Sequence, residues 1–359
     1  MPSTLHRPGA AAPGGDRLRT SAVGGWSVGP AAPLLGVLLV LAATAACRTP
    51  TAAPVAPTDV ASQIAVPPLA PTPAPTATVS PTLGVVATTS LVGDVVKAVG
   101  GERVAVHVLV GPDSDPHDYK PSPGDLAAIE AATIVFENGL HLEVSLEPLL
   151  ESIHPAHPAG DGGTVRIAVS DGIATMRGAA PADPADNPHV WWDPVRVKVW
   201  VANIAAALAA ADPPGAAGYQ TNAAAYAAEL DALDTWIRTQ TSALPPDRRV
   251  LVTDHEVLGY FAAAYGFTEI GAVVPSVSTE AEPSAKDLAA LEAAIAAHGV
   301  TAIFTGETVP TALSERVAAD TGTRLVPIFA EALSRPDGPA GTYVAFMRHN
   351  VTTIVEALR

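Results

Sequence analysis

From Gly84 onward, short hydrophobic runs alternate with longer stretches in which hydrophobic and polar residues are mixed. Short runs rich in β-branched residues predict buried strands, and they read GVVATT, RVAVHVLV, ATIVFEN and TVRIAV. The longer stretches LVGDVVKAVG and PSPGDLAAIEAA lie between them and predict helices. In the second stretch, Ser122 is a suitable N-cap because Pro123 follows it at the first helical position. Strands that alternate with helices predict a parallel sheet flanked by helices.

The same alternation starts again at residue 249. Strand-like runs read RVLVTD, EIGAVV, TAIFTG and RLVPIF. Helical stretches are expected near residues 256–265, 284–297, 310–321 and 341–358. The predicted fold class is therefore α/β with two lobes, each a mainly parallel sheet flanked by helices.

One long amphipathic helix is predicted between the two lobes. It begins after Asp212-Pro213-Pro214, and its apolar residues recur at spacings of seven, four, three and four: Tyr219, Tyr226, Leu230, Leu233 and Ile237. About 28 residues of helix span about 40 Å. We therefore expect an N-terminal lobe at 84–211, a stiff linking helix at 212–243 and a C-terminal lobe at 244–359.

The N-terminus has the pattern of an export signal over residues 1–46. Basic residues precede an apolar run from Leu34 to Ala46, which is too short for a comfortable spanning helix. Cys47 follows directly and is the only cysteine, so it cannot form an internal disulfide. The sequence before it resembles a bacterial lipobox, although Thr44 stands where leucine is usual. Acylation of Cys47 is the preferred interpretation, and a soluble secreted protein is the alternative.

Residues 47–83 combine this cysteine with a tether rich in proline, alanine and threonine. From Arg48 to Leu83, nine of 36 residues are proline and only Arg48 and Asp59 are charged. Such a segment cannot bury a core and is expected to be extended and semi-rigid. It would hold the folded body away from a membrane surface.

Charge and missing motifs remove several classes of function. Without residues 1–46 the chain keeps 17 basic and 35 acidic residues, a formal net charge of −18. Nucleic acid and anionic lipid headgroups are therefore poor partners. The sequence has no GxGxxG after the first strand, no Walker A motif and no GxSxG elbow. Dinucleotide, nucleotide and serine-hydrolase functions lose their usual support.

Four potential metal ligands each follow an apolar run and lie in polar turn sequence: His117, His189, His255 and Glu331. In parallel α/β sheets, ligands gather in the loops beyond the carboxyl ends of strands. Imidazole and carboxylate are common ligands of zinc and related ions, and four such groups can close a tetrahedral site. Because imidazole must be neutral to bind a metal, affinity is expected to fall as the pH drops through about 6 to 7.

Three strings carry a resemblance to a known family: PHDYKPSPGDL, NPHVWWDP and TDHEVLGYFAAAYGF. They resemble motifs of the zinc and manganese solute-binding lipoproteins of bacterial ABC transporters, which include streptococcal adhesins. The resemblance runs from about Gly84 to Leu358. It implies two α/β lobes joined by a long helix, with a metal held in the cleft between them.

Carried over by position, the family's ligands fall on His117, His189, His255 and Glu331. Glu256 competes with His255, and the distance to Tyr260 favours His255. The family's fourth ligand is an aspartate, so Glu331 is the main departure, and its extra methylene favours a shifted backbone or another mode of coordination.

Three functions are compatible with such a site. The preferred one is an exported, lipid-anchored and monomeric receptor that captures Zn2+, with Mn2+ as the alternative, and passes it to the transmembrane subunit of an ABC permease. Three imidazoles and one carboxylate favour zinc. An exported zinc hydrolase is the first alternative, with Asp254 or Glu256 as general base. A surface adhesin with a structural metal is the second.

Overall fold

The computed structural model describes residues 82–112, 114–152, 163–178 and 186–359, and this folded body is treated by itself. The predicted signal peptide and Cys47 lie outside the described residues.

The first half of the body is a parallel sheet with the strand order β2-β1-β3-β4. Its strands are β1 (Leu83–Thr89), β2 (Val104–Val110), β3 (Ile134–Glu137) and β4 (Val165–Ala168). Its helices are α1 (Ser90–Gly100), α2 (Pro123–Ala131) and the short α3 (Glu147–Leu150). The predicted N-cap is confirmed, since the Ser122 hydroxyl accepts from the amide of Asp125 in a reciprocal capping box.

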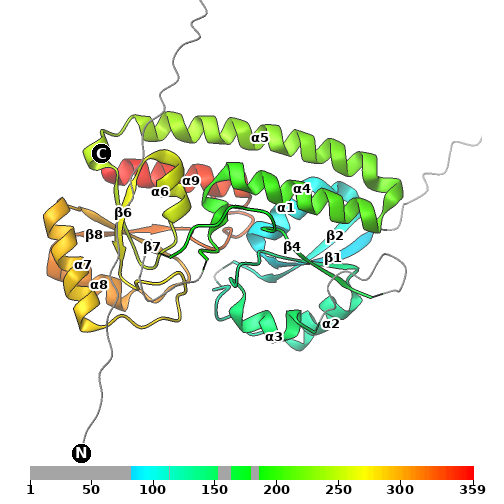
Figure 1. The fold of residues 1–359 in the computed structure, drawn as a ribbon, viewed down its shortest axis with the longest axis horizontal. Coiled ribbons are helices and arrows are strands. Elements are labelled where there is room, and N and C mark those ends of the chain that lie inside the picture. The colour runs from blue at the N-terminus through cyan, green and yellow to red at the C-terminus, as the bar shows by residue number, and fades with distance from the viewer. Residues whose placement is uncertain (1–81, 113, 153–162, 179–185) are drawn as a thin grey trace, which may run out of the picture. The chain divides into compact units, whose positions relative to one another are not determined.

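The second half repeats this architecture with the order β6-β5-β7-β8, again parallel throughout. Its strands are β5 (Val250–Thr253), β6 (Thr268–Ala272), β7 (Ala302–Gly306) and β8 (Arg324–Ile328). Its helices are α6 (Gly259–Tyr265), α7 (Ala285–His298), α8 (Ala312–Thr321) and α9 (Tyr343–Leu358). Figure 1 shows the two sheets with their flanking helices. The predicted fold class, two α/β lobes with parallel sheets, is confirmed.

Helix α5 (Ala216–Ser242) runs along both lobes, and its apolar face is the predicted one. Its buried residues include all five of the periodic positions: Tyr219, Tyr226, Leu230, Leu233 and Ile237. The helix contacts α1 and α4 as well as α6 and α9, so elements of both halves pack against it (Figure 1). Its 27 residues correspond to about 40 Å.

Helix α4 (Pro194–Ala211) was not predicted from the sequence. By length and composition it could cross a membrane. Its larger apolar residues, among them Trp200, Ile204 and Leu208, are nevertheless buried within the folded body, where the helix packs against α5 and α1. A core position therefore accounts for its apolar character. Short 3-10 turns lie at Gly101–Arg103, Val144–Leu146, Val190–Trp192, Pro213–Gly215 and Pro246–Arg248.

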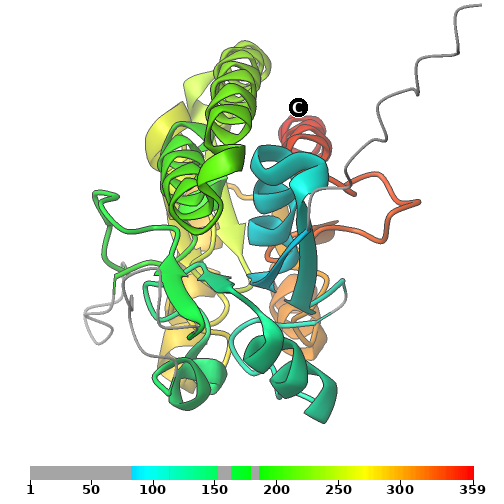
Figure 2. The same ribbon diagram turned by 90° about the vertical axis from the view of Figure 1, so that its right-hand side faces the viewer.

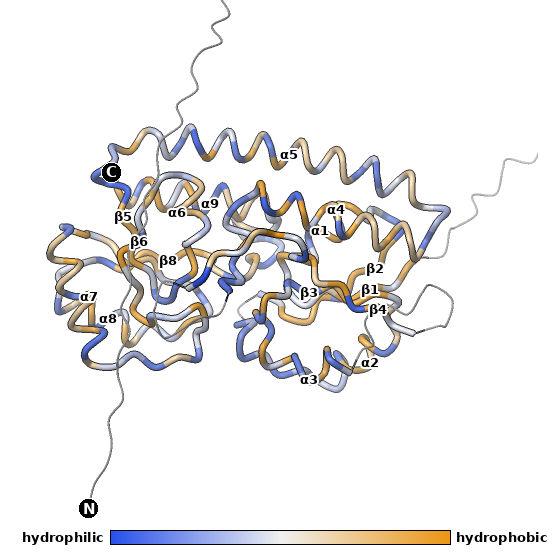
Figure 3. Tube along the Cα trace, in the orientation of Figure 1, coloured by the Kyte–Doolittle hydropathy of each residue, from blue (hydrophilic) through white to orange (hydrophobic). Residues whose placement is uncertain are grey.

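One hydrophobic core extends from the first sheet into the second. Trp192 is fully buried and contacts two aromatic rings of the second half, Phe261 at 6.1 Å and Phe346 at 5.3 Å between centroids. Helices α1 and α9 lie side by side (Figure 2). In Figure 3, strands β1 and β2 are coloured as hydrophobic, whereas α5 alternates along its length. This shared core places the loops at the strand ends of both sheets close to one another.

Candidate metal centre

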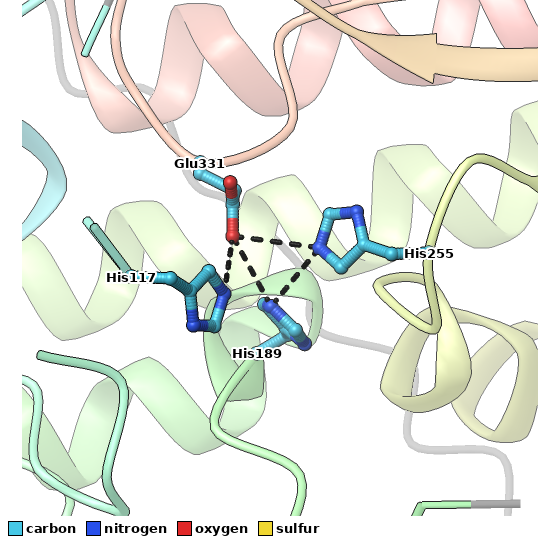
Figure 4. Close-up of side chains that lie close together, drawn as sticks. All are labelled: His117, His189, His255 and Glu331. Carbon is cyan, nitrogen blue, oxygen red and sulfur yellow. Dashed lines mark hydrogen bonds and ion pairs between the residues drawn. The ribbon is translucent and has the colours of Figure 1, made fainter. Parts of the chain in front are cut away.

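Loops from both halves of the body bring the four predicted ligands together (Figure 4). His117 lies in the loop between β2 and α2, and His255 follows β5 directly. Glu331 lies shortly after β8, and His189 precedes the 3-10 turn that leads into α4. All four side chains are buried, with at most 1% exposed. Strand ends of both sheets thus deliver three of the groups, and the turn before α4 delivers His189 to the same point. The sequence separation within this cluster reaches 214 positions.

The four side chains direct single atoms at one another. Glu331 Oε1 lies 2.9 Å from the Nε2 atom of His117 and 3.3 Å from that of His189. It lies 3.4 Å from Nε2 of His255, and this nitrogen is also 3.4 Å from Nε2 of His189. One potential ligand atom from each residue lies within 4.8 Å of all the others.

These distances fit a tetrahedral metal site. At the metal–ligand distances of zinc, neighbouring ligand atoms are separated by about 3.3–3.4 Å, the edge of the tetrahedron. Most of the observed separations are within a few tenths of an ångström of this value. Three imidazole nitrogens and one carboxylate oxygen are a suitable donor set for a divalent transition metal.

Asn187 and Asp254 fix the orientation of two of the imidazole rings so that Nε2 faces the cluster. Asn187 Oδ1 lies 2.9 Å from Nδ1 of His189, and Asp254 Oδ1 lies 2.9 Å from Nδ1 of His255. Both oxygens are acceptors, so each Nδ1 carries a proton and, in the neutral ring, Nε2 keeps its lone pair. The same two oxygens accept the backbone N–H of their histidines. Ring orientation and tautomer are therefore set before a metal binds.

His117 is held in a different way. Its backbone N–H donates to Asp115 Oδ1 at 2.8 Å, which orders the loop, whereas its buried Nδ1 has no hydrogen-bond partner among the described residues. The other carboxylate oxygen of Asp115 accepts the hydroxyl of Thr279 at 2.8 Å. This contact ties the His117 loop to the loop that follows β6.

The pKa values of three of the four side chains are shifted from their ordinary values, and the direction differs between the residues. Burial lowers the pKa of His189 to about 3, so this ring is neutral. Burial also opposes charge on His255, but the carboxylates of Glu331 and Asp254 outweigh it and raise the pKa well above its ordinary value. Burial alone would raise the pKa of Glu331, yet the imidazoles of His117 and His255 lower it well below its ordinary value. These shifts favour a protonated His255 beside an ionised Glu331.

Comparison with known proteins agrees with this geometry. The family model of the periplasmic zinc-uptake complex component A, ZnuA, matches residues 85–357. The chain belongs to the ZnuA family. It is 35% identical to the zinc-binding protein TroA of Treponema pallidum over 283 residues, which are 76% of this chain and 88% of that protein. It is 31% identical to the manganese-binding lipoprotein MntA of Bacillus subtilis over 288 residues, 77% and 90% of the two chains.

The solved structure of the periplasmic zinc-binding protein TroA of Treponema pallidum has the same fold. It superimposes with a TM-score of 0.71 at 31% identity and covers 78% of this chain and 99% of that one. A manganese-bound periplasmic metal-binding protein of Candidatus Liberibacter asiaticus gives a TM-score of 0.67 at 27% identity, covering 77% and 99%. The likeness to the ZnuA family thus spans nearly the whole described body.

Sequence reasoning located the four residues but not the groups that orient them. Asn187 was not identified, and Asp254 was considered only as a general base of a hydrolase. In the structure, Asp254 binds Nδ1 of His255 with one oxygen and the amide of Gly306 with the other. Both oxygens thus face away from Nε2, where a metal-bound water would lie. The signal that could have identified both residues is a short polar side chain one or two positions before a candidate ligand.

Gly306 lies where a side chain would disturb two of the four loops. A Cβ at this position would lie 2.9 Å from Cβ of Ala330 and 3.3 Å from Asp254 Oδ2. Gly306→Ala is expected to destabilise the protein by about 1–3 kcal/mol, as overpacking does, and to weaken zinc binding by shifting Glu331. Denaturant unfolding and a competitive zinc titration measure the two effects. Gly84→Ala is the matched control, because nothing lies within 4 Å of its Cβ; equal zinc affinity in both variants would contradict the prediction.

Proposed function

We propose that this protein is an extracytoplasmic receptor that captures Zn2+ and delivers it to the transmembrane subunit of an ABC-type permease. The observation that carries the proposal is the convergence of three Nε2 atoms and one carboxylate oxygen from both halves of the body. The four buried residues His117, His189, His255 and Glu331 would be the ligands. Membership in the ZnuA family supports the transport role.

The donor set supports zinc over manganese. Imidazole nitrogens suit zinc, whereas manganese prefers oxygen donors and higher coordination numbers. Glu331 directs Oε1 at the imidazoles, while its Oε2 faces the hydroxyl of Thr308 at 3.4 Å. A carboxylate that offers one oxygen completes a set of four donors. Mn2+ is the alternative ion, since relatives are named for zinc, manganese or iron.

The proposal includes no catalytic step. A zinc hydrolase needs an open coordination position for water and a nearby base. Here Glu331 takes part in the cluster, and Asp254 is bound to the Nδ1 side of His255. The metal is therefore proposed as cargo. A purely structural ion in an adhesin is the other alternative, and removal of the metal distinguishes it.

The same proposal covers the anchor and the tether. Acylation of Cys47 would attach the protein to the outer face of the cytoplasmic membrane, and the proline-rich segment would let a monomeric body reach the permease. Mass spectrometry of the protein isolated from membranes tests the acyl group. An unmodified thiol there would favour the soluble secreted form.

Zinc binding is tested by unfolding of the metal-free mature chain with and without zinc. At a free zinc concentration 1,000-fold above Kd, binding is expected to stabilise the fold by about 4 kcal/mol. His117→Ala should lose most of this gain, whereas His298→Ala, an exposed histidine at the end of α7, should keep it. Equal stabilisation of both variants would contradict the ligand assignment. If the chelator-treated protein unfolds outright, the metal is structural and not cargo.

A further inference from the structure

Two short stretches that precede His189, residues 176–177 and 186–187, pair with each other beside the metal centre, and this pairing is called the neck. The amide of Asn187 donates to the carbonyl of Met176 at 2.7 Å, and Arg177 pairs with Asp186 in an antiparallel bridge. Residues 176 and 187 therefore lie opposite each other in the neck. Only two positions separate Asn187 from the ligand His189.

The hydroxyl of a tyrosine in the second half forms a hydrogen bond with each of the two stretches of this neck. The hydroxyl of Tyr260, on α6, accepts the N–H of Met176 at 2.9 Å and donates to the carbonyl of Asn187 at 2.8 Å. The tyrosine is 1% exposed, and the Arg196 guanidinium lies 4.7 Å from its ring centroid. The hydroxyl thus satisfies the backbone donor of the part-buried Met176 and the backbone acceptor of the buried Asn187.

Asn187 transmits this contact to the ligand. Its Oδ1 binds both Nδ1 and the backbone N–H of His189, each at 2.9 Å. Its Nδ2 donates to the carbonyl of Glu256 at 3.1 Å, so the second half also holds the side chain of Asn187. The main chain and the side chain of one residue are thus tied to the opposite half of the body.

We infer that Tyr260 is a positioning residue for metal binding: its hydroxyl fixes the neck and thereby holds Asn187, and through Asn187 the tautomer and orientation of His189. The inference rests on the proposed function, because it concerns the affinity of the same site. Tyr260 lies in a different half of the body from His189, so the alignment of this ligand depends on contact between the halves. A ligand that is ordered in this way needs less reorganisation when the metal binds, so less free energy of binding is lost.

Tyr260→Phe tests the inference, because it removes one oxygen atom and keeps the ring and its contact with Arg196. The matched control is Tyr265→Phe. Tyr265 lies on the same helix and is also buried. The Arg238 guanidinium lies 5.1 Å from its ring centroid, and its hydroxyl donates to Asp234 at 3.0 Å. Among the described residues, its hydrogen bond and ring contacts are with Asp234, Phe261 and Arg238, not with the cluster of four. Any general effect of a lost tyrosine hydroxyl should be equal in the two variants.

Zinc affinity, measured by competition with a chelating dye, is expected to fall by about 10- to 100-fold in Tyr260→Phe and by less than about twofold in Tyr265→Phe. In a chain that already carries Asn187→Ala, the further loss from Tyr260→Phe should be less than about threefold, because the route to His189 is already broken. Full, independent losses in the double variant would overturn the inference.

A second measurement needs no metal. In the metal-free protein, the Nδ1–H proton of His189 should exchange with solvent at least about tenfold faster in Tyr260→Phe than in the unchanged protein, as seen by NMR, and Tyr265→Phe should not alter it. Unchanged exchange together with unchanged zinc affinity would overturn the inference and leave the proposed function standing. Absence of zinc binding in the unchanged protein would overturn the proposed function, while the exchange measurement would still decide the role of Tyr260.

Discussion

Glu331→Gln is expected to weaken zinc binding by about 100-fold or more. Four-ligand zinc sites bind with about 10–16 kcal/mol, so one of four ligands contributes about 3 kcal/mol on average, which is about 100-fold in affinity. The amide keeps the volume of the side chain but carries no charge. The oxygen that lies within 3.4 Å of all three Nε2 atoms would then be neutral, or an amide nitrogen would take its place. Competitive titration with a chelating dye measures the loss.

Glu137→Gln controls for the removal of a buried carboxylate. Glu137 is 4% exposed and pairs with Arg166 at 2.9 Å, away from the four ligands. This variant can lose stability, but it should keep the zinc affinity of the unchanged protein. Equal affinity in Glu331→Gln and the unchanged protein would remove Glu331 from the ligand set. Glu331→Asp adds a measure of reach, since retracting the carboxylate by one methylene should cost less affinity than neutralising it.

The sequence predicted those parts of the fold whose pattern is periodic. In α5 the spacing of the apolar residues named all five of its large buried side chains, because one face of a long helix packs while the other meets solvent. Helix α4 was not predicted, because its second half is mostly alanine and gives no contrast between faces. The helix expected from residue 256 begins at Gly259, since residues up to Val257 belong to the loop that presents His255.

The candidate site, like the fold, could be predicted from the sequence only in part. His117, His255 and Glu331 each follow a strand, and in a parallel sheet the strand ends meet at one edge, so their convergence could be predicted. His189 follows polar turn sequence, and it was indicated by the resemblance of NPHVWWDP to the family motif. The partners of the histidine rings were not predicted. A short polar residue one or two positions before a candidate ligand marks Asn187 and Asp254, but the role of each becomes specific only when the direction of the ring is known. The contact between Tyr260 and Met176 joins residues 84 positions apart, and no local pattern indicates it.

Zinc affinity is expected to fall about tenfold for each pH unit below the pKa of His255, starting above pH 6.5. The metal must displace the proton that the carboxylates of Glu331 and Asp254 hold on this ring, and each displaced proton contributes one power of ten per pH unit. His189, with a pKa of about 3, contributes nothing in this range. Unperturbed imidazoles would give a fall through about pH 6 to 7. The raised pKa therefore moves the onset of the fall to higher pH.

The metal-free protein should show the opposite dependence. Because the pKa of His255 is raised in the fold, its contribution to stability is fully present below about pH 6.5 and is lost as the pH rises through the folded pKa. Because the pKa of Glu331 is lowered, its contribution is present above about pH 4.5 and is lost as the pH falls through its folded pKa. The stabilisation that zinc adds should therefore grow as the pH rises from 6 to 8.

Calorimetric titration with zinc in buffers of different ionisation enthalpy measures the proton release directly, and the expected value at pH 7 is close to one proton per zinc. His107→Gln is the matched control. His107 faces Asp125 at 3.3 Å, and half of its side chain is exposed on β2, so its replacement should leave the metal centre unchanged. Zinc affinity that is constant between pH 8 and 6 would contradict the ion pair between His255 and Glu331. Zinc would then bind imidazoles that are already neutral, and no proton would have to leave His255 when the metal binds.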